Sequence, residues 1–150
     1  AVSLTFHGSQ PRVGVRIIRV QDGFDDDLWA AASPDGQAWS EPAQVPRDGG
    51  FGWDNPISLA VDSKGRGALA VPSLHGVPAP KPPACGLPKL ARSSDFAQWT
   101  TCSPDTNKTL SITAWHPSIV FAGNDKLYLA FRNNNTDSKV GAGVVLWREP

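Results

Sequence analysis

Short apolar runs alternate with turn-forming residues along the whole chain. The runs hold 4–8 residues rich in Val, Ile, Leu, Phe and Trp, and clusters of Gly, Pro, Asp, Asn and Ser separate them. This pattern predicts short β-strands, because branched and aromatic residues bounded by turn residues are typical of strands. The proline-rich segment from His75 to Pro88 is expected to be a long loop, since proline cannot donate to a strand ladder. The expected strands are Val2–His7, Val13–Val20, Leu28–Ser33, Pro42–Val45, Ile57–Val61, Gly67–Pro72, Lys89–Ser93, Thr100–Cys102, Ser118–Phe121, Leu127–Arg132 and Gly143–Trp147.

One motif occurs twice at a spacing of 60 residues. Ser33–Ser40 reads Ser-Pro-Asp-Gly-Gln-Ala-Trp-Ser, and Ser93–Thr100 reads Ser-Ser-Asp-Phe-Ala-Gln-Trp-Thr. A second unit recurs at nearly the same spacing, because the run that begins at Pro56 is similar to the run that begins at Pro117. The N-terminal run Ser3–Gly8 is similar to this second unit as well. Two independent motifs at one period indicate an internal repeat.

A repeat that holds three or four short strands is typical of a β-propeller blade. We therefore predict one all-β domain, a partial β-propeller of about three four-stranded blades spanning residues 1–48, 49–110 and 111–150. Closed propellers usually hold four to eight blades. We therefore expect either further blades of the same parent chain or a homo-oligomer, in which a neighbouring sheet covers each open blade.

The motif at Ser33–Ser40 resembles the Asp-box, or bacterial neuraminidase repeat, Ser-x-Asp-x-Gly-x-Thr-Trp, and Ser93–Thr100 resembles a degenerate copy. Over nearly its whole length the chain is similar to the sialidase-like Asp-box propeller superfamily. The resemblance implies a structural turn between the third and fourth strands of a blade. In such a turn the aspartate accepts backbone N–H bonds and the tryptophan packs between sheets. It implies structural roles for Ser33, Asp35, Gly36, Trp39, Ser93, Asp95 and Trp99.

Composition and motifs narrow the function classes. Lys+Arg and Asp+Glu both total 14, so the chain has no net charge to attract nucleic acid. No run of about 18 apolar residues occurs, so no membrane span is predicted. His7, His75 and His116 lack zinc-ligand spacing, and the acidic Asp25–Asp27 segment, expected in a loop, lacks the spacing of a calcium loop. No Gly-rich phosphate loop follows a strand, so we expect neither metal nor cofactor.

A repeated aromatic and polar group is the best candidate site. A tryptophan followed by polar residues stands just before the first strand of blades two and three. A Trp ring stacks on the apolar face of a sugar, while Asp, Asn or His side chains bind its hydroxyls. The alternative, that both tryptophans only pack between blades, stays open. The candidate sugar-binding residues are Trp53, Asp54, Asn55, Trp115, His116 and Arg132.

Three functions stay open. The first is carbohydrate binding by a lectin-like Asp-box propeller without catalysis. The second is part of a sialidase-like exo-glycoside hydrolase, for which the resemblance implies three clamping arginines, a Tyr–Glu pair and an Asp acid/base. The only tyrosine, Tyr128, lies in mid-strand, and Arg16 and Arg19 point to opposite faces of one strand, so the catalytic set is not evident. The third is a protein-interaction propeller.

The chain holds two cysteines, Cys85 and Cys102, with 16 residues between them. An even count at this spacing permits one disulfide, and two half-buried thiols are the alternative. We expect the disulfide, which would fasten the proline-rich loop to its blade. Since structural disulfides persist in oxidising compartments, we expect a secreted or extracellular protein.

Overall fold

The computed structural model describes residues 1–19, 25–46, 56–70, 90–102, 114–133 and 143–149. All regular secondary structure in these ranges is β-strand, which confirms the predicted all-β class. Within them, no helix is long and apolar enough to cross a membrane. The strands are β1 (Val2–His7), β2 (Gln10–Arg19), β3 (Asp25–Ala32), β4 (Ala43–Gln44), β5 (Ser58–Val61), β6 (Gly67–Ala70), β7 (Leu90–Ser93), β8 (Thr100–Cys102), β9 (Ala114–Phe121), β10 (Leu127–Asn133) and β11 (Gly143–Arg148).

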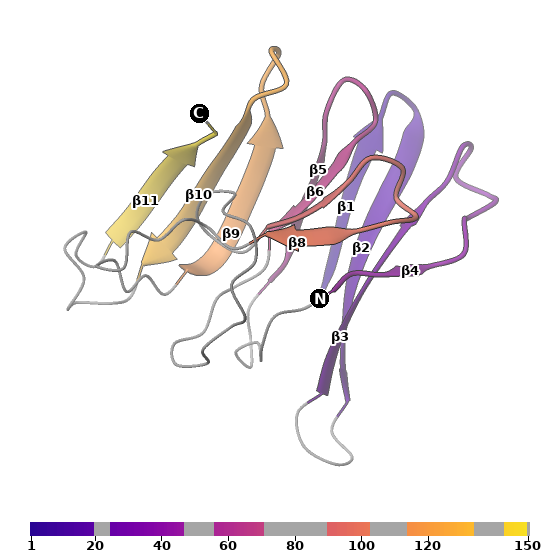
Figure 1. Cartoon of the computed structure of the whole chain (residues 1–150), viewed down its shortest axis with the longest axis horizontal. Helices are drawn as coiled ribbons and strands as arrows, with labels where there is room; N and C mark the ends of the chain where they lie inside the picture. Colours follow the sequence, from indigo (N-terminus) through magenta and orange to yellow (C-terminus); the bar gives the residue numbers. More distant parts are fainter. Residues whose placement is uncertain (20–24, 47–55, 71–89, 103–113, 134–142, 150) are drawn as a thin grey trace.

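The strands form three antiparallel sheets in which neighbours along the chain pair with each other. The first sheet has the order β1-β2-β3-β4, the second β5-β6-β7-β8 and the third β9-β10-β11. Figure 1 shows the three sheets side by side, with the β1–β2, β5–β6 and β9–β10 hairpin turns at the same edge. Strand β1 lies against β5, and β5 against β9. The first strands of successive sheets therefore adjoin, as the inner strands of propeller blades do, and the molecule is a partial β-propeller.

Two apolar layers hold the sheets together. Residues of β3, such as Leu28 and Ala30, meet Leu59 and Leu69 in the layer between the first and second sheets. The layer between the second and third sheets consists of Ala60, Ala68, Ala70, Leu90, Ile119, Leu127, Leu129 and Phe131. Strand side chains alternate between faces, so the central sheet contributes to both layers. This explains why β6 is a continuous apolar run whose four residues are all buried.

The same hydrogen bond joins each pair of adjacent sheets. The backbone N–H of Leu59 donates to the Ser3 hydroxyl at 3.0 Å, and that of Ile119 donates to the Ser58 hydroxyl at 3.1 Å. Each donor lies on the first strand of its sheet, which has a ladder on one side only. The serine of the preceding sheet thereby satisfies an N–H group that would otherwise be unpaired in a nearly closed interface. The repeat in the sequence is therefore also a repeat in packing.

Three strands begin earlier than predicted. Strand β2 starts at Gln10 instead of Val13, because its ladder with β1 continues as far as the pair His7 and Gln10. Strand β9 starts at Ala114 instead of Ser118, because its ladder with β10 continues as far as the pair Asn133 and Ala114. Strand β3 starts at Asp25, so the acidic segment expected in a loop is part of a ladder with β2. A run of charged residues does not look like a strand, but the extension of an existing hairpin needs only backbone hydrogen bonds.

The two motif tryptophans have different surroundings. Trp99 is 6% exposed and meets the Phe96 ring edge-on, with 5.2 Å between ring centroids. Trp39 is 44% exposed, which differs from the expected packing between sheets. It lies on the face of the first sheet that no described sheet covers, beside an apolar hollow of about 620 Å³. The predicted loop from His75 to Pro88 and the predicted Cys85–Cys102 disulfide lie outside the described residues and side chains.

Gly67 is the point of closest approach in the first apolar layer. A Cβ at this position would lie 2.8 Å from two ring carbons of Phe96 and 2.9 Å from the Trp99 ring. We expect Gly67→Ala to lower the free energy of unfolding by about 1–3 kcal/mol, since both rings must shift. Urea denaturation measures the change. The control is Gly123→Ala, whose Cβ would have no atom within 4 Å. Equal stability of the two variants would contradict this packing.

Candidate functional site

The two ends of the sheets differ in character. The three hairpin turns and both Ser-x-Asp turns lie at one end, here called the turn end. Strands β3, β5 and β9 begin, and β10 ends, at the other end, here called the opposite end, because every sheet is an antiparallel meander. The inner strands β5 and β9 adjoin, so the residues at their starts come together near the propeller axis.

Three of the predicted site residues lie together at the opposite end. Arg132 of β10 is the cross-strand partner of Trp115 in β9, and His116 follows Trp115. His116 and Arg132 are exposed, and for Trp115 the structure describes the backbone position only. The predicted residues Trp53, Asp54 and Asn55 lie outside the described residues.

A β-bulge shapes this corner. Ser118 pairs with Ala130 and Trp115 with Arg132, so two residues of β9 oppose one residue of β10. His116 takes a left-handed backbone conformation with φ of 50°. Such a conformation is uncommon outside glycine, and bulges and backbone strain concentrate where a fold redirects side chains at functional sites. Local sequence does not predict this conformation, since a residue before proline ordinarily takes an extended backbone with negative φ and His116 precedes Pro117.

At the turn end, the first Ser-x-Asp turn is closed by its own side chains. The Ser33 hydroxyl accepts the backbone N–H of Gly36 at 2.8 Å. The Asp35 carboxylate accepts the N–H groups of Gln37 and Ala38 at 2.8 and 2.9 Å. These N–H groups of Ala38 and Gln37 lower the pKa of Asp35, because they stabilise its charged form.

The second turn has the same hydrogen bonds, with Ser93 bound to the Phe96 N–H and Asp95 bound to Ala97 and Gln98. The pKa of Asp95 is lowered by the same cause, first Gln98 and then Ala97. Phe96 replaces the glycine of the first turn and keeps its left-handed backbone, with φ of 64°. The buried ring compensates for this strain by packing against Trp99. Both carboxylates hold their own turns and are structural.

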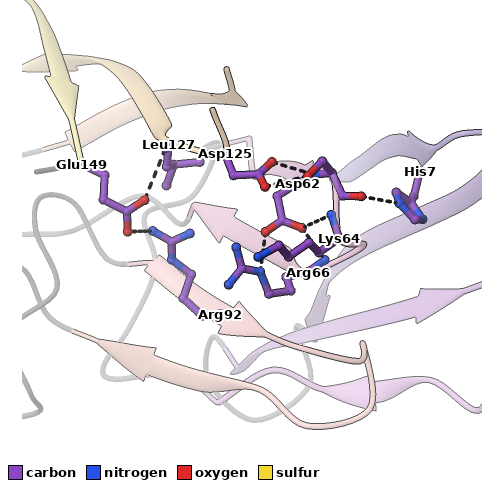
Figure 2. Close-up of polar contacts among 9 residues, drawn as sticks. His7, Asp62, Lys64, Arg66, Arg92, Asp125, Leu127 and Glu149 are labelled. Carbon is purple, nitrogen blue, oxygen red and sulfur yellow. Dashed lines mark hydrogen bonds and ion pairs between the residues drawn. The ribbon is translucent and has the colours of Figure 1, made fainter. Parts of the chain in front are cut away.

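A polar hollow of about 490 Å³ lies between the second and third sheets at the turn end (Figure 2). Arg92 donates to the Glu149 carboxylate at 2.8 Å and stands over the Phe121 ring at 5.7 Å. Glu149 also accepts the backbone N–H of Leu127 at 3.3 Å. Burial lowers the pKa of Arg92, and the charge of Glu149 opposes that change. No local pattern in the sequence indicates this ion pair, because its partners are 57 residues apart.

The carboxylates around this hollow already have partners within the protein. Asp62 forms an ion pair with Arg66 and accepts backbone N–H groups of its own hairpin turn. Asp125 accepts the Ser63 hydroxyl at 2.6 Å and the Ser63 backbone N–H at 2.8 Å, and both hydrogen bonds lower the Asp125 pKa. His7 Nε2 lies 3.1 Å from the carbonyl oxygen of Ser63. The row His7–Ser63–Asp125 thus connects all three hairpin turns, and the polar groups of the turn end hold the sheets together.

Within the described ranges, no group of three or more His, Cys, Asp or Glu side chains could hold a metal ion. The expected absence of a metal site concerned the whole chain and stays a prediction.

Comparison with known proteins gives few matches. No protein-family model matches the chain, and no curated protein matches it. Among solved structures, it is similar to a xylan β-1,4-xylosidase from Bacillus halodurans C-125, with 16% identity and a TM-score of 0.36. It is also similar to a mutant of the GH43 protein BlXynB from Bacillus licheniformis, with 17% identity and a TM-score of 0.32. Each match covers 99% of this chain and 40% of the other, so the chain spans about 40% of the length of these structures. The stacked sheets define the class as a partial β-propeller, and its function is argued below from its own residues.

The Ser-x-Asp turns make a pH-dependent contribution to stability. Asp95→Ala should lower the melting temperature at pH 7, because the Ala97 and Gln98 N–H groups lose their acceptor. A lowered pKa means that the stabilisation is complete above the unfolded pKa and is lost as pH falls through the folded pKa, below 3.8. The difference in melting temperature between the wild type and Asp95→Ala should therefore become smaller as the pH falls through that range. Calorimetry at several pH values measures it.

Asp95→Asn serves as the control, because it keeps an oxygen acceptor and removes only the charge. We expect it to melt between wild type and Asp95→Ala at pH 7. If Asp95→Ala melted like the wild type, the carboxylate would not hold the turn.

Proposed function

We propose that this chain is part of a carbohydrate-binding propeller of the sialidase-like Asp-box class, and that it binds sugar at the opposite end without catalysis. The cross-strand pair of Trp115 and Arg132, beside the left-handed His116, carries this proposal. These three residues are of types used in sugar recognition. Trp115 and His116 lie near the start of the inner strand β9, and Arg132 lies near the end of β10. Two Ser-x-Asp turns with the same hydrogen bonds support the class.

The chemistry of the corner suits a sugar ring. An indole ring supplies an apolar stacking face, and the guanidinium of Arg132 supplies several N–H donors in one plane for hydroxyls or a carboxylate. His116 adds a donor or acceptor in an exposed position. Pro56, which follows Asn55 in the sequence, lies two residues before the adjoining inner strand β5, at the same end. Trp53, Asp54 and Asn55 are therefore part of the proposal as further sugar ligands.

A sialidase-like glycoside hydrolase is the second candidate, and one observation favours it. Strand β3 begins with Asp25, Asp26 and Asp27 at the same end as Arg132, which brings carboxylates to the sugar-binding end. A general acid needs a raised pKa. In the described part of the chain, the carboxyl groups with a shifted pKa are Asp35, Asp95 and Asp125, and each shift is downward. Each of these three carboxylates accepts hydrogen bonds at the turn end, away from Arg132.

Two assays separate the candidate functions. A glycan array that includes sialosides and xylo-oligosaccharides reports binding, and fluorogenic glycosides of the same sugars report hydrolysis. Binding without turnover is the expected result. Turnover would favour the hydrolase, and a blank array with a captured protein partner would favour a protein-interaction propeller. Secretion belongs to the same proposal and rests on the Cys85–Cys102 disulfide, which a thiol titration of the native protein tests.

Arg132→Ala tests the site directly. We expect the dissociation constant for the sugar that binds on the array to rise about 10- to 100-fold, because a charge-assisted hydrogen bond is lost. Arg132 is exposed, so the free energy of unfolding should change by less than about 0.5 kcal/mol. Calorimetric titration measures the affinity.

Lys64→Ala is the matched control, because it removes an exposed cation at the turn end. It should bind like the wild type. Equal losses in both variants would indicate a general charge effect, and no loss in Arg132→Ala would place the sugar elsewhere.

A further inference from the structure

The polar hollow of about 490 Å³ lies between the second and third sheets, at the turn end. Two cationic side chains line it: Arg66, which immediately precedes β6, and Arg92 of β7. Figure 2 shows both guanidinium groups in the space between the two sheets. Two like charges in one hollow attract an anion when their N–H donors are available to it.

Arg66 has such donors. It pairs with Asp62 through Nε, which is only one corner of the guanidinium group. Its two Nη nitrogens donate to none of the residues that the structure describes, and half of the side chain is exposed. Asp62 is itself buried and also accepts two backbone N–H groups of its turn. The aspartate therefore fixes the arginine in place while the Nη donors stay accessible from the hollow.

Arg92 is the second source of donors. Its Nη2 donates to Glu149 at 2.8 Å, and its guanidinium group lies 5.7 Å from the centroid of the Phe121 ring. Burial has the largest effect on the pKa of Arg92 and lowers it, the charge of Glu149 raises it, and the charge of Arg66 lowers it again. The two guanidinium groups therefore repel each other across the hollow. An anion bound between them would remove this repulsion.

The carboxylates of the hollow do not cancel these donors. Glu149 accepts Arg92 and a backbone N–H of β10, and Asp125 accepts two groups of Ser63. After the Ser63 hydrogen bonds, the positive charges of Arg66 and Lys64 also lower the pKa of Asp125. Each carboxylate thus faces hydrogen-bond donors or positive charge within the protein. The hollow offers a ligand mainly N–H donors.

The rim of the hollow adds further donors from another direction. Ser94 and Gln98 belong to the second Ser-x-Asp turn and Thr100 to β8, and all three are exposed. One guanidinium group satisfies a planar carboxylate, whereas donors that converge from several directions suit a tetrahedral oxyanion. A water molecule occupies about 30 Å³ in the liquid, so the hollow has room for a ligand much larger than a single ion.

We propose that this hollow binds a sulfate or phosphate ester, with the tetrahedral group held between Arg66 and Arg92 and the rest of the ligand lying toward the rim. Sulfate and phosphate share the chemistry that the donors recognise. The site is at the turn end, and the proposed sugar site is at the opposite end. This inference therefore does not rest on the proposed function.

Titration of the isotope-labelled chain with sodium sulfate at constant ionic strength tests the proposal. The backbone amides of Gly67 and Ser94 are suitable NMR probes, because both residues line the hollow. We expect saturable shifts of both amides with sulfate and with inorganic phosphate, and much weaker binding of acetate. The absence of saturable shifts, or equal affinity for acetate, would overturn the tetrahedral oxyanion.

Arg66→Gln removes the Nη donors and should raise the dissociation constant for sulfate at least about tenfold. Lys64→Gln is the matched control, because it removes an exposed cation of the same hairpin turn that does not line the hollow. It should bind sulfate within about twofold of the wild type, since solvent and salt screen its charge. Unchanged binding by Arg66→Gln, or equal losses in both variants, would overturn the site.

Ser94→Asp tests the same site without touching either arginine. It places a carboxylate on the exposed rim and should also weaken sulfate binding at least about tenfold, because like charges repel. Ala97→Asp is its control, since Ala97 is exposed in the same turn and does not line the hollow. Equal affinity of these two variants for sulfate would contradict the position of the anion.

Glucose 6-sulfate and glucose 6-phosphate distinguish the two sources of the oxyanion, and glucose alone is the neutral control. We expect one ester to bind more tightly than its inorganic ion, because the hollow contacts the rest of the molecule. That ester identifies the source. If neither ester binds more tightly than its ion, or if glucose alone gives the same shifts, the hollow is not a site for a sulfate or phosphate ester.

Discussion

Every inner strand of this fold has a backbone edge that no ladder satisfies. An inner strand pairs with one neighbour in its own sheet, so alternate N–H groups face the preceding sheet. Ser3 and Ser58 each satisfy one such group, with Leu59 and Ile119 as donors. This contact fixes how far one sheet is shifted against the next. The apolar layers and the polar row across the hairpin turns both follow from that placement.

Under the proposed function, the turn end of the propeller supplies stability and the opposite end supplies recognition. At the turn end, carboxylates such as Asp35 and Asp95 accept local N–H groups, and Asp125 joins neighbouring hairpins. At the opposite end, a bulge turns His116 into a strained conformation next to Arg132. Backbone strain at an exposed corner adds nothing to packing, which is why we place the sugar site there.

Much of the fold follows from local patterns in the sequence. The strands Val2–His7 and Thr100–Cys102 have the predicted bounds, because turn residues delimit them on both sides. The early starts of β3 and β9 depend on ladder pairing, which local composition does not encode. Trp39 shows the same limit. Its sequence motif is nearly that of Trp99, but its exposure depends on whether a sheet lies beside it.

The candidate site was predictable only in part. Residue type and position in the chain predict Arg132, Trp115 and His116 as site residues, and the antiparallel register brings them together. The bulge that shapes the corner arises because two residues of β9 oppose one residue of β10, and this pairing cannot be read from either strand alone. The ion pair of Arg92 and Glu149 joins different sheets, so no spacing along the chain could indicate it.

Amide hydrogen exchange of Leu59 and Ile119 is the most direct test of the stacked sheets. Neither N–H belongs to the ladder of its own sheet, so protection must come from the serine of the preceding sheet. Stacked blades predict slow exchange at both amides, and Ser3→Ala should accelerate exchange at Leu59 more than at Ile119. Exchange of both amides at the rate of an unstructured peptide, while the ladder amides of β5 and β9 stay protected, would contradict the stacking of the sheets.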